Sequence, residues 1–335
     1  MRLVKYTSRR LLLLPVQLLV VSLIVFFLVR LMPGEPTFLY TGPFATMERV
    51  AEVRRQLSLD QPIYVQYAKY IERVVQGDFG LSLRTSQPVM TDIRQRLPAT
   101  MELILLAVIF SVLIGVPLGV YTAIRNTGVI NRIVFLYGMM AGALPDFWFA
   151  LIAIFVFFYT FELLPGPIGR IGLMVSVPET ITGMYFIDSI LTGNLEAFTS
   201  SVAHLVLPVV TLVFIYMPLV LKNAQSAMGD MLGSDFVTFA RASGLSRLMQ
   251  WRYALRNAMP PIITVTGILT WFLLGGAVLV ETVFAWGGLG QYAVQSVVNA
   301  DYAALQGVVL LSAVFTMIVF LLVDLAYFVV DPRIK

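Results

Sequence analysis

Few side chains in this sequence have the types and spacing that catalysis or metal binding requires. The chain has one histidine, His204, and no cysteine, so neither a multi-histidine metal site nor a thiolate site can form. It contains no G-x-x-x-x-G-K-[ST] motif for nucleotide phosphates. No motif places a serine nucleophile beside a base. We therefore expect a non-catalytic chain with no cofactor of its own, and we interpret His204 as a packed or interfacial residue.

Two acidic residues lie within or at the end of long apolar runs. Asp146 follows Pro145 near the middle of the run 131–161, and Glu281 ends the run 262–280. Proline breaks a helix, and a carboxylate inside a membrane should face the protein interior or a wet cavity. One interpretation places Asp146, Phe147 and Trp148, with Glu281, beside a path through the membrane. In the alternative, Pro145 lies near an interface and Asp146 only caps a helix.

The composition of the chain excludes most soluble folds. Of its 335 residues 59% are hydrophobic and only 13% are charged, whereas soluble domains carry about 25% charged residues. Mean hydropathy is +0.85. Several apolar runs approach the roughly 20 residues that cross a bilayer as a helix. These features predict an all-α polytopic membrane protein. The net charge of +4 does not indicate nucleic acid, because the basic residues lie in loops beside apolar runs.

The apolar runs predict about six spans in a single membrane domain over residues 1–335, at about 11–32, 100–124, 131–161, 202–221, 262–280 and 305–328. Short loops assigned to the inside carry Arg125 and Arg132, and the C-terminal tail carries Arg333 and Lys335. The positive-inside rule therefore places both termini in the cytoplasm. In the second span Gly115 and Gly119 form a G-x-x-x-G pair, which permits close helix contact but is also common by chance.

The polar segment 33–97 is too charged to cross a membrane. Helical periodicity over 47–57 and 61–76 predicts amphipathic helices that form a small extracytoplasmic cap. The apolar face expected for the second helix consists of Ile63, Tyr64, Tyr67, Ile71, Val74 and Val75. A further outer loop is expected over 162–201, where Arg170 stands among acidic residues.

A polar island between two later spans covers residues 222–261 and reads KNAQSAMGDMLGSDFVTFARASGLSRLMQWRYALR over its first part. Phe236, Phe239 and Ala240 recur at i, i+3 and i+4, which predicts a helix. Gly244 follows and is suited to end that helix in a left-handed conformation. The island therefore predicts a helix and a glycine turn on the cytoplasmic side, with the character of a docking surface.

A second short helix is predicted after this glycine. Leu245, Leu248 and Leu255 would form its apolar face, and Pro260 and Pro261 would mark the start of the next membrane helix.

This order of features resembles the cytoplasmic loop of ATP-binding-cassette (ABC) importer permeases. In the peptide branch of that family the loop runs close to D-[YF]-[VI]-x-x-A-R-A-x-G-L-S-R, followed by A-L-R-N-A-x-x-P. Thr238 stands where the glutamate that names the loop would be, so no acidic contact is carried over. The matching positions are Asp235, Phe236, Val237, Ala240, Arg241, Ala242, Gly244, Leu245, Ser246 and Arg247, then Ala254, Leu255, Arg256, Asn257, Ala258 and Pro261.

Other stretches are similar to the same family. They include LVRLMPGEP after the first span, LPDFWFAL in the third and ETVFAWGGLG after the fifth. The resemblance therefore covers almost the whole chain. It implies a type I ABC importer permease fold, in the plasma membrane of a bacterium or archaeon.

The resemblance also implies a mechanism and partners. Such permeases work with a second permease, two ATP-binding subunits that hold ATP and Mg²⁺, and an extracytoplasmic substrate-binding protein. The loop around Asp235–Gly244 would sit in a groove of an ATP-binding subunit, with Phe236 and Phe239 as apolar anchors. Arg241 and Arg247 would hold charges or carbonyls of the partner, and Ala240 and Leu245 belong to the same loop.

The expected cargo is a peptide, and the same branch also carries nickel chelates, glutathione, opines and oligosaccharides. An ion-driven secondary transporter is the main rival class. It predicts inverted repeats and buried ionisable residues at broken helices, of which Asp146 alone is a candidate.

Overall fold

The chain is all-α in the parts that the computed structural model describes, which are residues 2–31 and 60–330 with the isolated positions 46, 48, 51, 52 and 55. No strand occurs within these ranges, where the only β-type pairing is a single bridge between Leu81 and Pro88. The expected all-α class is therefore confirmed. The motif at Pro33–Pro36 and the terminal Arg333 and Lys335 lie outside the described residues, as does most of the expected helix at 47–57, whose described positions 48, 51, 52 and 55 are helical.

Four helices are long and apolar enough to cross a membrane. They are α5 (Val89–Ile124), α9 (Leu195–Leu232), α11 (Arg247–Val283) and α13 (Tyr302–Val330). A bent pair, formed by α6 (Val129–Ala143) and α7 (Asp146–Ala153) with its continuation η1 (Ile154–Thr160), makes one further candidate span. The first helix α1 (Arg2–Leu31) has an apolar segment at Leu14–Leu28. The described helices thus match the predicted runs, and the multi-pass prediction is confirmed.

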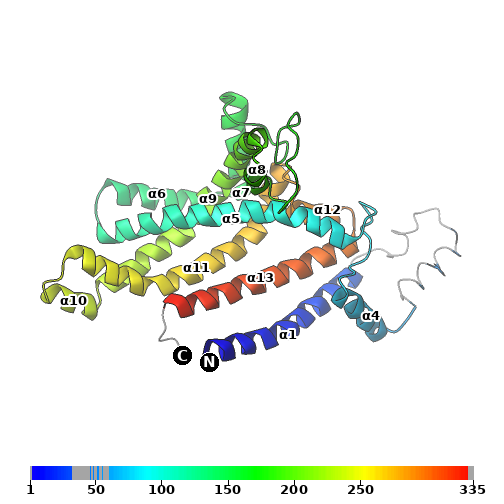
Figure 1. Ribbon diagram of the computed structural model, residues 1–335, viewed down its shortest axis with the longest axis horizontal. Helices are drawn as coiled ribbons and strands as arrows, with labels where there is room; N and C mark the ends of the chain where they lie inside the picture. The colour runs from blue at the N-terminus through cyan, green and yellow to red at the C-terminus, as the bar shows by residue number, and fades with distance from the viewer. Residues whose placement is uncertain are drawn as a thin grey trace.

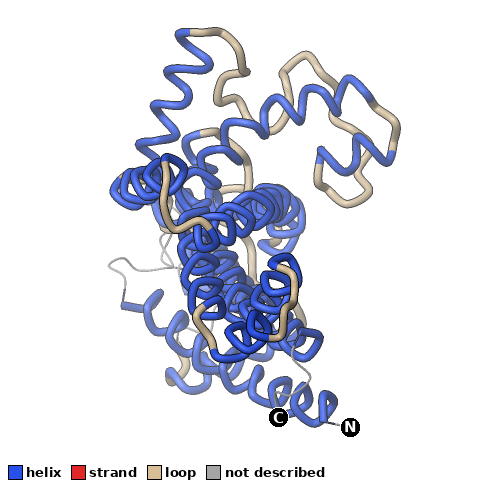
Figure 2. Tube along the Cα trace, turned by 90° about the vertical axis from the view of Figure 1, so that its left-hand side faces the viewer, coloured by secondary structure: helices blue, strands red, loops and turns tan. Residues whose placement is uncertain are grey.

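The spans lie side by side along one long axis (Figure 1). The short helix α10 (Asp235–Ala242) lies at one end, which we call the α10 end. Helices α4 (Ile63–Val75) and α12 (Leu289–Val298) lie towards the opposite end, the α4 end. The beginning of α1 and the end of α13 face the α10 end (Figure 1). Figure 2 looks along the bundle from the α10 end.

The centre of the bundle is the contact of α5 and α11 with α9. Its buried side chains include Leu103, Leu212 and Leu269, one from each helix. Gly115 and Gly119 let α5 approach α9 closely. A Cβ on Gly119 would lie 2.5 Å from the backbone oxygen of Leu221. The G-x-x-x-G pair is therefore a true helix–helix contact.

The amphipathic helix α4 packs on the outer part of the bundle. Tyr67, Ile71 and Val74 pack against a buried cluster that includes Phe26 of α1, as the sequence predicts for that face. Tyr70 is buried in the same cluster, however, while the predicted face residues Ile63, Tyr64 and Val75 are exposed. The apolar stripe is therefore shifted along the helix surface. Tyrosine carries an apolar ring and a polar tip, so its position does not reveal which side of a helix is inside.

Helices α5, α9 and α11 extend furthest beyond their predicted limits. Helix α5 begins at Val89 and includes the last part of segment 33–97, and α9 begins at Leu195, inside the predicted loop 162–201. The predicted second short helix of the polar island is wrong, because α11 runs without a break from Arg247 through Pro260 and Pro261. Prolines are tolerated inside membrane helices where neighbouring groups satisfy the freed carbonyls.

The third apolar run is broken at Pro145, as expected from the effect of proline on a helix. Helix α6 ends at Ala143, and α7 leaves Asp146 at an angle of 107° to it. The segment α7–η1 projects sideways from the bundle in Figure 1. The chain then returns through residues 161–184 and helix α8 (Tyr185–Leu191) to the start of α9.

Candidate functional site

The helix α10 is held against the bundle by its two buried side chains. Val237 is fully buried with Met228 of α9 and Ala254 of α11, and Ala240 is buried beside it. Ala240 therefore lies on the packed side of α10, whereas the sequence pattern grouped it with Phe236 and Phe239. The buried pair fixes the orientation of α10, and so decides which residues it presents outwards.

The turn after α10 has the geometry that its glycine predicts. Gly244 has φ of +78°, a left-handed conformation that suits glycine. The Leu245 N–H donates to the Ala240 carbonyl and the Gly244 N–H to the Arg241 carbonyl, both at 3.1 Å, which is the Schellman pattern. Gln250, buried in the first turn of α11, donates from Nε2 to the Leu245 carbonyl at 2.8 Å. These bonds make the turn a defined structure.

The outer side of this helix and turn is strongly exposed. Phe239 is 74% exposed, Leu248 72% and Phe236 41%. Asp235, Arg241, Gly244 and Arg247 are also exposed, and Leu245 is partly so. We call these eight residues the α10 surface. Leu248 was predicted to lie on the apolar face of a short helix, whereas the structure presents it with the phenylalanines.

The broken span brings Asp146 to the middle of α9. Its Oδ2 accepts a hydrogen bond from the Tyr216 hydroxyl at 3.2 Å, and its Oδ1 accepts the Phe147 N–H at 2.8 Å. Phe147 and Trp148 are partly exposed on α7. Tyr216 in turn lies over Gly276 of α11, which has no side chain to displace it. Asp146 thus joins α7 to two spans, and it also occupies the first turn of α7.

Glu281 is placed differently from the other path candidates. It is 0% exposed, and its carboxylate accepts hydrogen bonds from the Thr100 hydroxyl and from the Gln291 N–H at 3.0 Å. A Cβ on Gly288 would collide with both carboxylate oxygens, so the glycine lets the turn close over Glu281. The Trp286 indole N–H also donates to the Ala99 carbonyl at 2.9 Å. In this structure Glu281 fastens the α11–α12 turn to α5 and lines no open surface.

One ionic site was not identified from sequence. Arg170 forms a salt bridge with Glu102 of α5 at 2.7 Å, and it donates to the Gly183 carbonyl at 2.9 Å. Its guanidinium also lies 3.7 Å from the ring centre of Tyr185. The signal in the sequence was the isolated Arg170 of an acidic loop, but its partner lies 68 positions away. The contacts anchor the loop after η1 to the bundle.

The described residues contain no cluster of three or more His, Asp and Glu side chains that could hold a metal ion. His204 is buried, and its Nδ1 lies 2.8 Å from the Ser200 carbonyl of the same helix. This agrees with the interpretation of His204 as a packed residue.

Comparison with known proteins agrees with this arrangement. Residues 115–335 match the family model "Binding-protein-dependent transport system inner membrane component", and residues 3–104 match the N-terminal model of the same kind of membrane component.

Individual relatives cover nearly the whole chain. A probable D,D-dipeptide transport system permease protein of Escherichia coli is 39% identical over 94% of this chain and 92% of its own length. The dipeptide transport system permease protein of Haemophilus influenzae is 38% identical over 99% of both chains. That of Alkalihalophilus pseudofirmus is 35% identical over 98% of this chain and 99% of its own length.

The multi-pass helical bundle agrees with the matched family models and with the full-length relatives. This chain therefore belongs to the family of inner membrane components of binding-protein-dependent transport systems.

Proposed function

We propose that this chain forms half of the translocation path of an ATP-driven importer for peptides. The relatives that match nearly its full length are named as dipeptide or D,D-dipeptide transport permeases, which supports a short peptide as cargo. The other half of the path is a second permease. An extracytoplasmic binding protein delivers the cargo, and two ATP-binding subunits, which hold ATP and Mg²⁺, drive the cycle.

The observation that carries the coupling role is the α10 surface. An exposed helix and turn that bear two phenylalanines and are flanked by two arginines are costly to leave in water, but they suit an interface with a protein partner. Its rigid base on α9 and α11 transmits force from α10 to two spans. ATP-driven closure of the motor subunits therefore moves the bundle through α10.

The α10 end faces the cytoplasm in this proposal. Arg125 and Arg132 lie in or next to the α5–α6 connection, and Arg241 and Arg247 flank the Gly244 turn. The α5–α6 connection and the Gly244 turn follow the positive-inside rule when they are cytoplasmic. Both the start of α1 and the end of α13 face the same way (Figure 1), which supports cytoplasmic termini. The loops near α4 and α12 then meet the binding protein outside.

The path passes the broken span. Asp146, Phe147 and Trp148 lie where α7 departs from α6, and an acidic residue at this depth is most stable beside a wet cavity. Glu281 contributes indirectly in this proposal, by holding the α11–α12 turn in place.

The Gly244→Pro substitution tests the coupling role. Proline cannot adopt a φ of +78° and has no N–H for the Arg241 carbonyl, so the turn should open while the membrane helices remain. We expect normal amounts of the permease in the membrane but little peptide uptake, with ATP hydrolysis no longer dependent on the loaded binding protein.

Gly244→Asn is the matched control, because asparagine tolerates the left-handed conformation, and it should retain uptake. Normal uptake by Gly244→Pro would refute the coupling role of the turn.

A further inference from the structure

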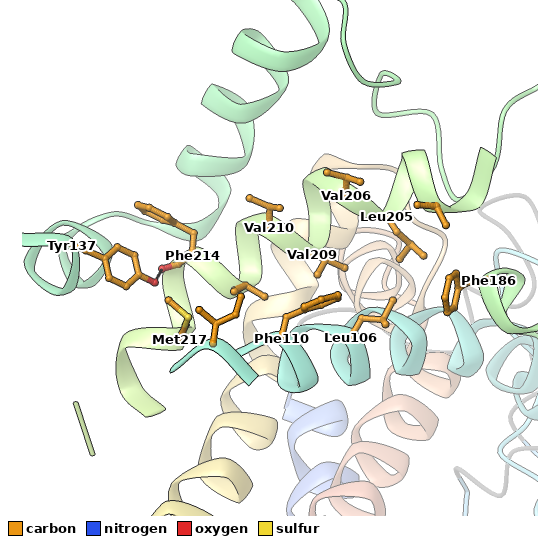
Figure 3. A pocket seen from close by; sticks show the side chains of 13 residues that line it. Leu106, Phe110, Tyr137, Phe186, Leu205, Val206, Val209, Val210, Phe214 and Met217 are labelled. Atoms are coloured by element: carbon orange, nitrogen blue, oxygen red, sulfur yellow. Dashed lines mark hydrogen bonds between the residues drawn. The ribbon is translucent and has the colours of Figure 1, made fainter. Parts of the chain in front are cut away.

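An apolar groove along α9 offers a ligand no free polar side chain among the described residues. Its lining side chains are hydrocarbon apart from the Met217 thioether and the Tyr137 hydroxyl (Figure 3). That hydroxyl donates to the Phe214 carbonyl at 2.7 Å and is therefore satisfied. A charged side chain without a partner lies elsewhere, near the start of α5 at the α4 end of the bundle.

This side chain is Arg96, in the second turn of α5. It is partly buried, and its Nε is enclosed by protein without a hydrogen-bond partner. The other guanidinium N–H groups also form no hydrogen bond or ion pair with a described residue. Arginine stays charged and carries five N–H donors, and a buried donor without an acceptor is unfavourable. An acceptor supplied from outside the described chain would therefore be stabilised at this position.

Tyr292 of α12 holds the guanidinium in place. The guanidinium carbon of Arg96 lies 4.8 Å from the centre of the Tyr292 ring, which is a cation–π contact. Tyr292 is buried, and its hydroxyl donates to Asp92 Oδ2 at 2.9 Å. The Thr85 hydroxyl donates to the same oxygen at 2.6 Å. Asp92 is thus committed to two hydroxyls, and no ion pair joins it to Arg96 within 4.0 Å.

The exposed charge around Arg96 is basic. Residues 80–100 contain three arginines and a single acid, Asp92, which is buried. The other two arginines, Arg84 and Arg94, are exposed. The Arg84 N–H also donates to the buried Asp301 at 3.4 Å, which ties its segment to the start of α13. A basic surface built from two anchored segments suits an acidic protein surface better than one small anion.

The proposed orientation places this surface outside the membrane. The apolar run that predicts the second span begins at about residue 100, one turn of helix after Arg96. Helix α12, which carries Tyr292, is then near the extracytoplasmic binding protein.

We propose that Arg96 is the receptor for an acidic side chain of the binding protein. The planar guanidinium would hold the carboxylate by two parallel hydrogen bonds, in the geometry that arginine favours. Its position on the Tyr292 ring prepares it for this contact, and Arg84 and Arg94 attract the acidic surface. The inference rests on the importer function proposed above.

The test measures how tightly the importer binds its peptide-loaded binding protein. The assembled complex is placed in nanodiscs of phosphatidylcholine, and biolayer interferometry gives the Kd at low and at physiological ionic strength. The variants are Arg96→Gln, Arg96→Lys and Arg73→Gln. Arg73 is an exposed arginine of α4 at the same end of the bundle, so Arg73→Gln removes the same charge and is the matched control.

We expect Arg96→Gln to weaken binding about tenfold or more, because a partly desolvated carboxylate loses its donors. Arg96→Lys keeps the charge without the paired N–H groups, so its loss should be smaller. Arg73→Gln should change the Kd by less than about twofold. The Tm of Arg96→Gln should stay near the original value, since Arg96 has no hydrogen-bond acceptor in the described chain.

The partner carboxylate can be identified with double-mutant cycles. Each cycle combines Arg96→Gln with the neutralisation of one acidic residue of the binding protein. Neutralising the true partner should add almost no further loss in the Arg96→Gln background. A set of cycles in which every acid is additive with Arg96→Gln would overturn the proposal.

The same measurements separate this inference from the importer function. An unchanged Kd for Arg96→Gln, with normal binding by the unmodified complex, would overturn the inference and leave the importer function standing. Absence of binding by the unmodified complex would overturn both. Equal weakening by Arg73→Gln and Arg96→Gln would reduce the effect to general attraction between charges, and would also overturn the inference.

Two further results would assign Arg96 to another anion and so overturn the proposal. A loss of affinity that appears only in nanodiscs containing phosphatidylglycerol would assign it to a lipid phosphate. An unchanged Kd, with lower uptake of a dipeptide but not of its C-terminal amide, would assign it to the carboxylate of the cargo.

Discussion

Thr100 of α5 and Glu281 at the end of α11 share a hydrogen bond in the fully buried interior of the bundle. The Thr100 oxygen also accepts the Leu289 N–H at 2.8 Å. One hydroxyl therefore connects α5 to both sides of the α11–α12 turn. This turn belongs to the ETVFAWGGLG stretch that resembles the permease family, so the motif has a structural explanation.

Replacing Thr100 by valine should destabilise the protein. The change keeps the volume but leaves the Glu281 carboxylate and the Leu289 N–H with fewer partners, at a cost of about 1–3 kcal/mol in the free energy of unfolding. A lower Tm of the purified complex, measured by intrinsic fluorescence, would report this loss. Thr100→Ser retains the hydroxyl and should stay near the original Tm. Identical Tm values for the Thr100→Val variant and the unmodified protein would argue against the role of this hydrogen bond.

Two adjacent glycines in α11 should respond differently to alanine. A Cβ on Gly276 would overlap the Tyr216 hydroxyl, whereas a Cβ on Gly275 meets no atom within 4 Å. Gly275→Ala should therefore be neutral or stabilise the helix by up to about 1 kcal/mol. Gly276→Ala should displace Tyr216 from Asp146 and destabilise the protein by about 1–3 kcal/mol, as overpacking does.

Thermal unfolding of the two glycine variants side by side tests this difference. Peptide uptake by Gly276→Ala, compared with Tyr216→Phe, then reports whether the Tyr216–Asp146 contact matters for transport. Equal Tm values for Gly275→Ala and Gly276→Ala would contradict the predicted overlap.

Substitutions at two nearby positions of α10 should distinguish its role in docking from its role in folding. Phe239→Ala removes a side chain that is exposed in the isolated permease, so its Tm should change little. Its affinity for the ATP-binding subunits should fall by about 2 kcal/mol or more, if Phe239 is an interface hot spot. Val237→Ala instead leaves a space between α10, Met228 and Ala254, and should lower stability by about 1–2 kcal/mol.

Two measurements distinguish these roles. A titration of the ATP-binding subunit against the permease in nanodiscs gives the affinity, and thermal unfolding gives the stability. Normal binding of the ATP-binding subunit by the Phe239→Ala variant would show that Phe239 is not part of the docking surface.

The segment around α8 (Tyr185–Leu191) should loosen at low pH. Asp188 of α8 is buried, which opposes its ionisation, but hydrogen bonds from Thr182 and from the Gly183 and Ile181 N–H groups lower the pKa of its carboxyl below the ordinary value. A lowered folded-state pKa stabilises the loop fully above the unfolded pKa of about 3.9. This contribution is lost as the pH falls through the folded pKa.

Hydrogen exchange of residues 180–194 between pH 7 and pH 3 would detect this change. Protection should be constant above about pH 5 and fall below pH 4. Asp188→Asn should exchange faster at neutral pH and show no further acid-dependent step. Acid-independent protection of the unmodified loop would contradict the prediction.

The sequence alone determined the class of the protein and most of its elements. Apolar runs near the length of a bilayer crossing have few alternatives to spanning helices, because no water is present to satisfy an open backbone. The helix at α10 and its glycine turn also follow from local chemistry. Residues within five positions of one another make these hydrogen bonds, and Gly244 suits the left-handed turn.

The tertiary structure decided which side of each element faces inwards. Ala240 and Phe239 are neighbours in sequence, but the position of α10 on Met228 and Ala254 buries one and exposes the other. Likewise, Glu281 is a packing residue because Thr100, 181 positions away, lies beside it. Arg170 pairs with Glu102 for the same reason. Such contacts depend on how whole helices pack, and local spacing carries no information about distant partners.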